Sequence, residues 1–174
     1  GQNPFGHDND GDLDLFVVNG GMHHLVCWED LLLRNDGSGR FDDGLEQAGP
    51  YFLERTVGRG SIRGDYDNDG DVDLVVTRLG DSPHLLRNDA PLAASWITLD
   101  LEGAHRRDAF GAVVRVEAGN REQVAQSWPA TAYLGQSDPR LHFGLGSDVD
   151  RVDRITVDWP SGATLVLEDV AARQ

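Results

Sequence analysis

Lysine is missing from this 174-residue chain, so all of its 15 basic residues are arginines, and they stand against 30 acidic residues. The resulting formal net charge of −15 leaves no basic footprint for nucleic-acid phosphates and no attraction to anionic membranes. Cysteine is almost as scarce, because Cys27 alone can form neither an intrachain disulfide nor a cysteine-rich metal site. These absences exclude nucleic acid as a partner and direct attention to the acidic residues.

Long apolar runs are also absent. No stretch approaches the roughly 20 apolar residues that cross a bilayer, so we expect no membrane insertion. No signal peptide is visible at the start of the chain. The chain opens on Gly1-Gln2-Asn3-Pro4, in the middle of a repeated pattern, which predicts a fragment of a longer protein and leaves its location open.

The acidic residues are concentrated before residue 94, where the sequence D-Y-D-N-D-G-D-V-D forms one continuous loop over residues 65–73. Carboxylates stand at loop positions 1, 3, 5 and 9, glycine stands at position 6, and position 7 would offer its backbone carbonyl. Calcium takes six to eight oxygen ligands, and alternate side chains of a tight loop can converge on one point. The pattern predicts a Ca²⁺ site whose ligands are Asp65, Asp67, Asp69, Asp71 and Asp73.

Two other interpretations of this loop are weaker. An EF-hand needs a glutamate at position 12 and a helix on each side, whereas position 12 is Val76 in an apolar run that predicts a buried strand. A solvated acidic turn without a cation would leave five aspartates repelling one another within nine residues. The metal interpretation is therefore favoured.

A second copy of the loop lies 59 residues earlier, where Gly11 takes the place of Gly70. Gly6 occupies its first position, so this copy lacks one carboxylate. Weak binding, a water in place of the missing ligand, and an empty loop all remain open. The predicted ligands of this weaker site are Asp8, Asp10, Asp12 (through its carbonyl) and Asp14.

The repeat extends beyond the loops, because Leu15–Val18 corresponds to Leu74–Thr77 and Leu32–Asp36 corresponds to Leu85–Asp89. The second correspondence has an offset of 53, so the later copy is six residues shorter. Repeats of about 60 residues with short strands and glycine-rich turns are typical of propeller blades. We therefore predict an all-β chain with propeller-type repeat blades in residues 1–93.

The pattern changes after Asp89, and residues 94–174 contain no further aspartate loop. About six short strands are predicted there, which suits a small β-sandwich or barrel as a second domain. The predicted strands are 96–101, 113–117, 123–126, 140–146, 154–159 and 164–167.

These residues carry a resemblance to known families. The aspartate loops resemble the FG-GAP (VCBS-type) repeats of β-propellers, and the second part resembles the ASPIC/UnbV domain. The stretches that carry the second resemblance are D-A-F-G-A-V-V (108–114), Y-L-G-Q-S-D-P (133–139), H-F-G-L-G (142–146) and V-D-W-P-S-G (157–162). The resemblance implies calcium in the repeat loops and a secreted, cell-surface or periplasmic protein similar to the cartilage acidic protein 1 family. It also implies an adhesion, scaffold or binding role with a protein or glycan partner.

An enzymatic role is the alternative. The chain has no Gly-x-Ser-x-Gly nucleophile elbow and no candidate base beside Cys27. Loop carboxylates that face a cation stay ionised and cannot act as proton donors. A calcium-stabilised binding module is therefore predicted. The alternative is a component of an enediyne-like biosynthetic system, which the family resemblance implies, or of a carbohydrate-acting enzyme system.

Overall fold

The computed structural model describes residues 2–21, 26–44, 48–89, 94–103, 107–128, 130 and 132–174. These residues form strands and one short 3₁₀ helix, and no α-helix occurs among them. The elements that precede residue 90 are β1 (Gln2–Phe5), β2 (Asp14–Val17), β3 (Leu31–Asn35), β4 (Phe41–Asp43), η2 (Pro50–Leu53), β5 (Gly58–Gly64), β6 (Asp73–Arg78) and β7 (His84–Leu86). The later strands are β8 (Ser95–Leu99), β9 (Glu102–Gly103), β10 (Arg107–Asp108), β11 (Val113–Ala118), β12 (Arg121–Gln126), β13 (Leu141–Gly146), β14 (Arg151–Asp158) and β15 (Thr164–Ala171).

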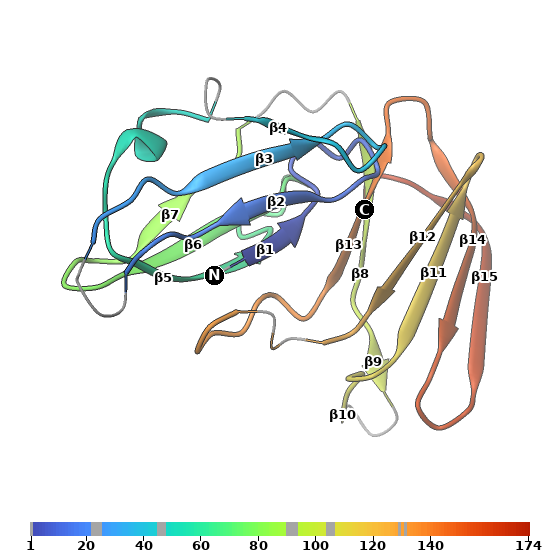
Figure 1. Cartoon of the computed structure of the whole chain (residues 1–174). Helices are drawn as coiled ribbons and strands as arrows, with labels where there is room; N and C mark the ends of the chain where they lie inside the picture. Colours follow the sequence, from blue (N-terminus) through green and yellow to red (C-terminus); the bar gives the residue numbers. More distant parts are fainter. Residues whose placement is uncertain are drawn as a thin grey trace. The chain divides into compact units, whose positions relative to one another are not determined.

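The earlier strands form two antiparallel meanders, one in the order β1-β2-β3-β4 and one in the order β5-β6-β7 (Figure 1). The two meanders repeat each other in register. Leu15 pairs with Leu33 in the first, and Leu74 pairs with Leu86 in the second. These partners are related by the offsets of 59 and 53 found in the sequence, so the pairing of β2 with β3 and of β6 with β7 agrees with the predicted repeat. Successive antiparallel meanders are the architecture of propeller-type blades.

Alternating apolar residues of both meanders meet in one core, because side chains on a strand point to opposite faces in turn. Phe16 and Val76 at its centre are fully buried. The core cluster consists of Phe5, Phe16, Val18, Leu32, Phe52, Val72, Leu74 and Val76. Val72 belongs to the aspartate loop itself, so this loop is anchored directly on the core.

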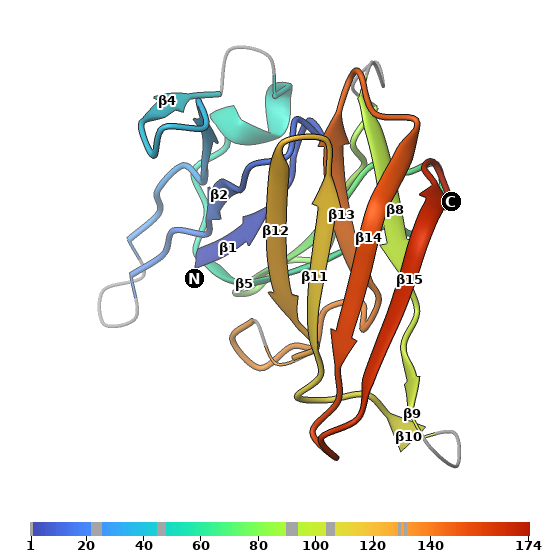
Figure 2. The same ribbon diagram turned by 90° about the vertical axis from the view of Figure 1, so that its right-hand side faces the viewer.

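The later strands form a four-stranded antiparallel sheet in the order β12-β11-β14-β15 and a pair formed by β8 and β13. Figure 2 shows the pair lying behind the larger sheet, and Figure 1 shows the same two layers edge-on. Residues of both layers share one core, including Ile97 of β8, Phe143 of β13, Val114 of β11 and Ile155 of β14. Two antiparallel sheets packed over one core are a sandwich, as predicted. The two-residue strands β9 and β10 were not predicted.

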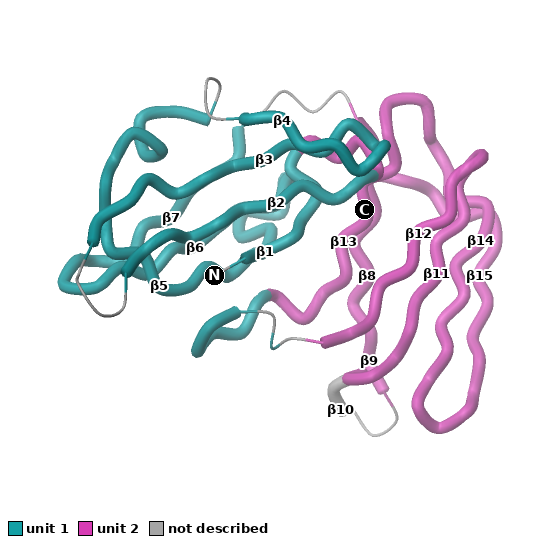
Figure 3. The backbone as a smooth tube through the Cα atoms, viewed as in Figure 1, with its two compact units in different colours: residues 1–7, 12–89, 130–137 teal, residues 8–11, 90–129, 138–174 magenta. Residues whose placement is uncertain are grey.

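By backbone proximity the chain divides into two compact units (Figure 3). The first contains residues 1–7, 12–89 and 130–137, and the second contains residues 8–11, 90–129 and 138–174. Residues 8–11 of the first aspartate loop therefore belong to the unit that contains the sandwich, and residues 130–137 belong to the unit that contains the meanders. The predicted domains 1–93 and 94–174 stay a prediction, and their boundary at residues 90–93 lies outside the described residues. No helix within the described part of the chain is long and apolar enough to span a membrane.

Candidate metal centre

The second aspartate loop is the turn of the β5–β6 hairpin, which closes on the pair Gly64 and Asp73. Two residues at its tip take up left-handed backbone conformations, Asn68 with a φ of 58° and Gly70 with a φ of 97°. Asparagine and glycine are the residues that tolerate this region best, so the sequence at the tip suits the turn. The hairpin thereby brings side chains from both ends of the loop to one place.

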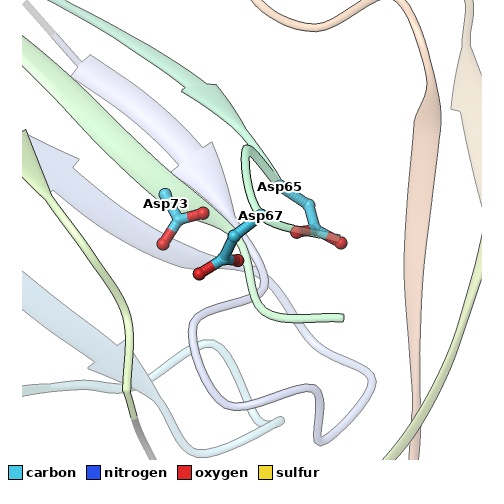
Figure 4. A group of neighbouring side chains, drawn as sticks. All are labelled: Asp65, Asp67 and Asp73. Carbon is cyan, nitrogen blue, oxygen red and sulfur yellow. The ribbon is translucent and has the colours of Figure 1, made fainter. Parts of the chain in front are cut away.

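Three carboxylates gather at this turn (Figure 4). Asp65, Asp67 and Asp73 each place one carboxylate oxygen so that all three oxygens lie within 4.8 Å of one another. Oxygens bound to one calcium ion at 2.3–2.6 Å cannot be more than about 5 Å apart, so the spacing suits a shared cation. Among the described residues this is the one such group of three or more histidine, cysteine or acidic side chains.

Backbone N–H groups hold two of these carboxylates in place. Asp65 accepts hydrogen bonds from the N–H groups of Asp69 and Gly70, at 3.2 and 3.0 Å. Asp73 accepts one from Tyr66 at 3.1 Å on Oδ2 and one from Asn88 at 2.8 Å on Oδ1. Because a carboxylate oxygen carries two lone pairs, each can still face a cation. The loop is therefore organised by its own backbone and by the backbone N–H of Asn88, which follows β7.

Asp73 is 2% exposed and Asp65 is 6% exposed, whereas Asp67 is exposed to solvent. Burial raises the pKa of the Asp73 carboxyl, although its hydrogen bonds from Asn88 and Tyr66 oppose that shift. Arginine offers little compensation, since Arg87 Nη1 lies 4.0 Å from Asp67 Oδ2 while Arg87 Nη2 lies 2.6 Å from Asp89. A cation is the partner that these buried carboxylates favour.

The loop pattern predicts that Asp71 contributes its backbone carbonyl, but it does not predict where the Asp71 carboxyl group lies. The structure buries this residue to 2% exposure. Burial first, and then the charges of Asp69, Asp73, Asp65 and Asp67, raise the pKa of Asp71 to about 7. Asp69 and Asp71 are outside the group of three, so their predicted ligand roles stay predictions.

The first aspartate loop repeats part of this geometry. Asp14 accepts hydrogen bonds from His7 N at 2.8 Å on Oδ2 and from Asn35 N at 2.9 Å on Oδ1, as Asp73 does from Tyr66 and Asn88. Asp8 accepts a bond from the Asp10 N–H at 3.3 Å. Asp8 and Asp10 belong to the second unit, whereas Asp12 and Asp14 belong to the first. The structure therefore describes no single ligand group for this loop, and its site stays a prediction.

Sequence reasoning missed the part played by Asn35 and Asn88. Each donates its backbone N–H to the ninth-position aspartate of one loop, across 21 residues in the first copy and 15 in the second. The signal was present, because both asparagines lie in the repeated stretch L-L-R-N-D. The repeat thus includes the aspartate loop and the strand end whose asparagine N–H donates a hydrogen bond to it.

Comparison with known proteins agrees with this architecture. Residues 7–76 match the family described as an FG-GAP-like repeat, and residues 102–174 match the family described as ASPIC and UnbV. The chain is 25% identical over 175 residues to cartilage acidic protein 1 of Mus musculus, covering 96% of this chain and 26% of the relative. It is 25% identical over 173 residues to cartilage acidic protein 1 of Homo sapiens, covering 95% of this chain and 25% of the relative. The chain thus spans about a quarter of the length of these curated relatives, and the resemblance seen in the sequence is confirmed.

Proposed function

We propose that the chain is a calcium-binding module in which calcium has a structural role, because residues 7–76 match an FG-GAP-like repeat and residues 102–174 match the ASPIC and UnbV family. The turn between β5 and β6 would hold one Ca²⁺ through Asp65, Asp67 and Asp73, with Asp69 and the Asp71 carbonyl completing the shell. The observation that carries this proposal is the convergence of three carboxylate oxygens within 4.8 Å on one turn.

The chemistry of the donor set supports calcium over other metals. All the donors are hard oxygens, and neither histidine nor cysteine belongs to the group, whereas zinc and other transition metals favour nitrogen and sulfur. Magnesium usually keeps several waters and binds through one or two carboxylates. A loop that offers three carboxylates together, with further acidic groups beside them, suits the larger ion.

The burial of the ligands supports a structural role. Asp65 and Asp73 are nearly inaccessible to solvent, and Val72 between them packs into the core of the meanders. A cation that neutralises these groups stabilises the folded state alone, because the unfolded chain has no preformed site. Calcium binding and folding of the first unit are therefore coupled in this proposal.

The cellular setting is part of the same proposal. The relatives are named cartilage acidic protein 1, and loops of this type suit the millimolar calcium found outside the cytosol. We place the chain in an extracellular or cell-surface protein, as a scaffold or adhesion module. Its partner would be a protein or a glycan, because the net charge of −15 disfavours nucleic acid.

Calcium titration by calorimetry on metal-stripped protein tests the proposal, together with a melting curve at each end point. The informative variant is Asp67→Asn, which removes the charge of an exposed ligand without opening a cavity. Its matched control is Asp42→Asn, which makes the same change in an exposed side chain of β4. We expect Asp67→Asn alone to lower calcium affinity and the calcium-dependent rise in Tm. Equal melting temperatures of the wild-type protein in calcium and in EDTA would refute the structural role.

A further inference from the structure

Asn88 makes two contacts that concern different aspartate loops. Its backbone N–H donates to Asp73 Oδ1 at 2.8 Å, at the end of the second loop. Its side-chain Nδ2 donates to the carbonyl oxygen of His7 at 2.8 Å, 81 residues away at the start of the first loop. One residue therefore fixes the closing carboxylate of one loop and the backbone of the other.

The connection continues through His7 into the first loop. The His7 N–H donates to Asp14 Oδ2 at 2.8 Å, and the other oxygen of Asp14 accepts the Asn35 N–H at 2.9 Å. Asp73 and Asp14, the ninth-position aspartates that close the two loops, are thus joined by three hydrogen bonds. These bonds connect Asp73 with Asn88, Asn88 with His7, and His7 with Asp14. All of these residues belong to the first unit.

Within the part of the chain that the structure describes, the repeat-equivalent residue makes no such connection. Asn35 directs its Nδ2 to the carbonyl oxygen of Leu13 at 3.3 Å, inside its own loop, and its Oδ1 accepts the N–H groups of Gly37 and Gly39. Asn35 therefore supports the loop and turn next to it. Asn88 is the copy whose side chain reaches the other loop, and Asn35 serves as a natural control.

We propose that Asn88 is a positioning residue through which calcium at the second loop orders the first loop. This inference rests on the proposed calcium site and goes beyond it, because it assigns a coupling between the two loops. A cation bound to Asp73 restricts this carboxylate, which holds the Asn88 backbone and with it the bond to His7. Because His7 is then already ordered, the first loop closes on Asp14 at a lower cost in conformational entropy. Calcium binding at the second loop and ordering of the first loop are therefore cooperative.

The coupling is reciprocal by thermodynamic necessity. If the first loop also takes up a cation, occupancy of either loop raises the affinity of the other, and Asn88 transmits both effects. If the first loop holds no cation, calcium at the second loop still rigidifies the backbone around His7 and Asp14. The amide hydrogen of His7 reports on either case, because it is bonded to Asp14.

Hydrogen exchange resolved by residue, measured by NMR with and without calcium, tests this coupling. We expect calcium to slow exchange of the His7 amide by about tenfold in the wild-type protein, the scale of one hydrogen bond that becomes persistent. Asn88→Asp keeps the shape and the backbone N–H but lacks the side-chain donor, and Asn88→Ala removes the side chain without adding a charge. In both variants the slowing should disappear while calcium still binds to Asp65, Asp67 and Asp73.

Asn35→Ala is the matched control, and it should lower Tm by loosening the turn at Gly37 while leaving the calcium effect on His7 intact. Calcium binding without any slowing at His7 in the wild-type protein would overturn the coupling and leave the calcium site standing. Equal slowing in the wild-type protein and in either Asn88 variant would also overturn it. An absence of calcium binding to the wild-type protein, seen by calorimetry, would overturn the calcium site and the coupling together.

Discussion

The two aspartate loops have the same backbone conformation at their tips, but the tips are buried to different extents. Asn9 and Asn68 have φ angles of 57° and 58°, and the glycines that follow them, Gly11 and Gly70, both have a φ of 97°. Asn9 is 1% exposed, whereas Asn68 is exposed to solvent. The same turn is thus buried at its tip in one copy and open in the other.

Contacts within the second unit account for the burial of Asn9. Its carbonyl oxygen accepts the Gly146 N–H at 2.9 Å, and its Oδ1 lies 2.7 Å from His142 Nε2. The approach is so close that a Cβ at Gly144 would lie 2.6 Å from the Asn9 Cα. The loop that lacks the first carboxylate is therefore the one held by protein contacts. The comparison teaches that side chains and backbone can supply at one loop the order for which a cation is proposed at the other.

Loss of the ninth-position aspartate should reveal the largest difference in calcium dependence between the two loops. We expect Asp73→Ala to abolish calcium binding and with it the gain in stability that calcium gives. That gain is about 3–4 kcal/mol if calcium is present at 100 to 1,000 times its Kd. Asp14→Ala should leave most of the calcium-dependent rise in Tm. Calorimetry and melting curves of both variants, with and without calcium, measure the difference, and equal losses would mean that the loops do not differ in metal dependence.

Restoring the missing first-position carboxylate should make the calcium affinity of the first loop more like that of the second. The backbone at Gly6 has room for a side chain, because a Cβ there would approach only the Asp12 carbonyl oxygen, at an ordinary 3.7 Å. Gly6→Asp should therefore raise calcium affinity at this loop by about tenfold or more, since affinity in such loops follows the number of charged ligands. Calorimetric stoichiometry provides the measurement, and Gly6→Asn, which adds no charge, is the control. An unchanged titration would show that protein contacts have closed this loop to metal.

Asp71 gives the second loop a pH dependence in the absence of metal. Its pKa is raised from 3.8 to about 7, so the folded state binds more protons than the unfolded state between these values. The contribution of Asp71 to the stability of metal-free protein should therefore be greatest below pH 4, fall as the pH rises toward 7, and become level above it. Melting curves between pH 5 and 8 in EDTA check this decrease. Asp71→Asn should flatten it, whereas an unchanged decrease would assign it to other groups.

Much of the fold could be predicted because it depends on local patterns. The apolar run after the loop predicted β6. The repeat offsets predicted that the two copies have equivalent residues, and the structure pairs such residues alike, Leu15 with Leu33 and Leu74 with Leu86. The sandwich strands were likewise marked by their alternation and by the turns between them. The convergence of Asp65, Asp67 and Asp73 followed from their spacing along one turn.

The remainder depends on contacts between distant parts of the chain. The clasp of Asn88 on Asp73 requires the register of β6 against β7, which no single stretch encodes. The burial of Asp71 depends on how the loop rests on the core, and the grouping of residues 8–11 with the sandwich depends on β13. Periodicity identifies strands and loops, but it does not reveal which side chain a folded neighbour will cover.

Arg87 should produce the smallest effect on the second loop. Its Nη1 lies 4.0 Å from Asp67 Oδ2, so it places positive charge beside a proposed calcium ligand, although its closer partner is Asp89. Removing that charge in Arg87→Gln should raise calcium affinity by about twofold to threefold at low salt, and the gain should shrink as salt screens the exposed guanidinium. Arg34→Gln, the equivalent change in the first copy of the repeat, should leave the second-loop affinity unchanged. Calorimetry at two ionic strengths measures both variants. A decrease in affinity on removing Arg87 would mean that its pairing with Asp89 supports the strand end that clasps Asp73, so that the arginine assists calcium binding at this loop.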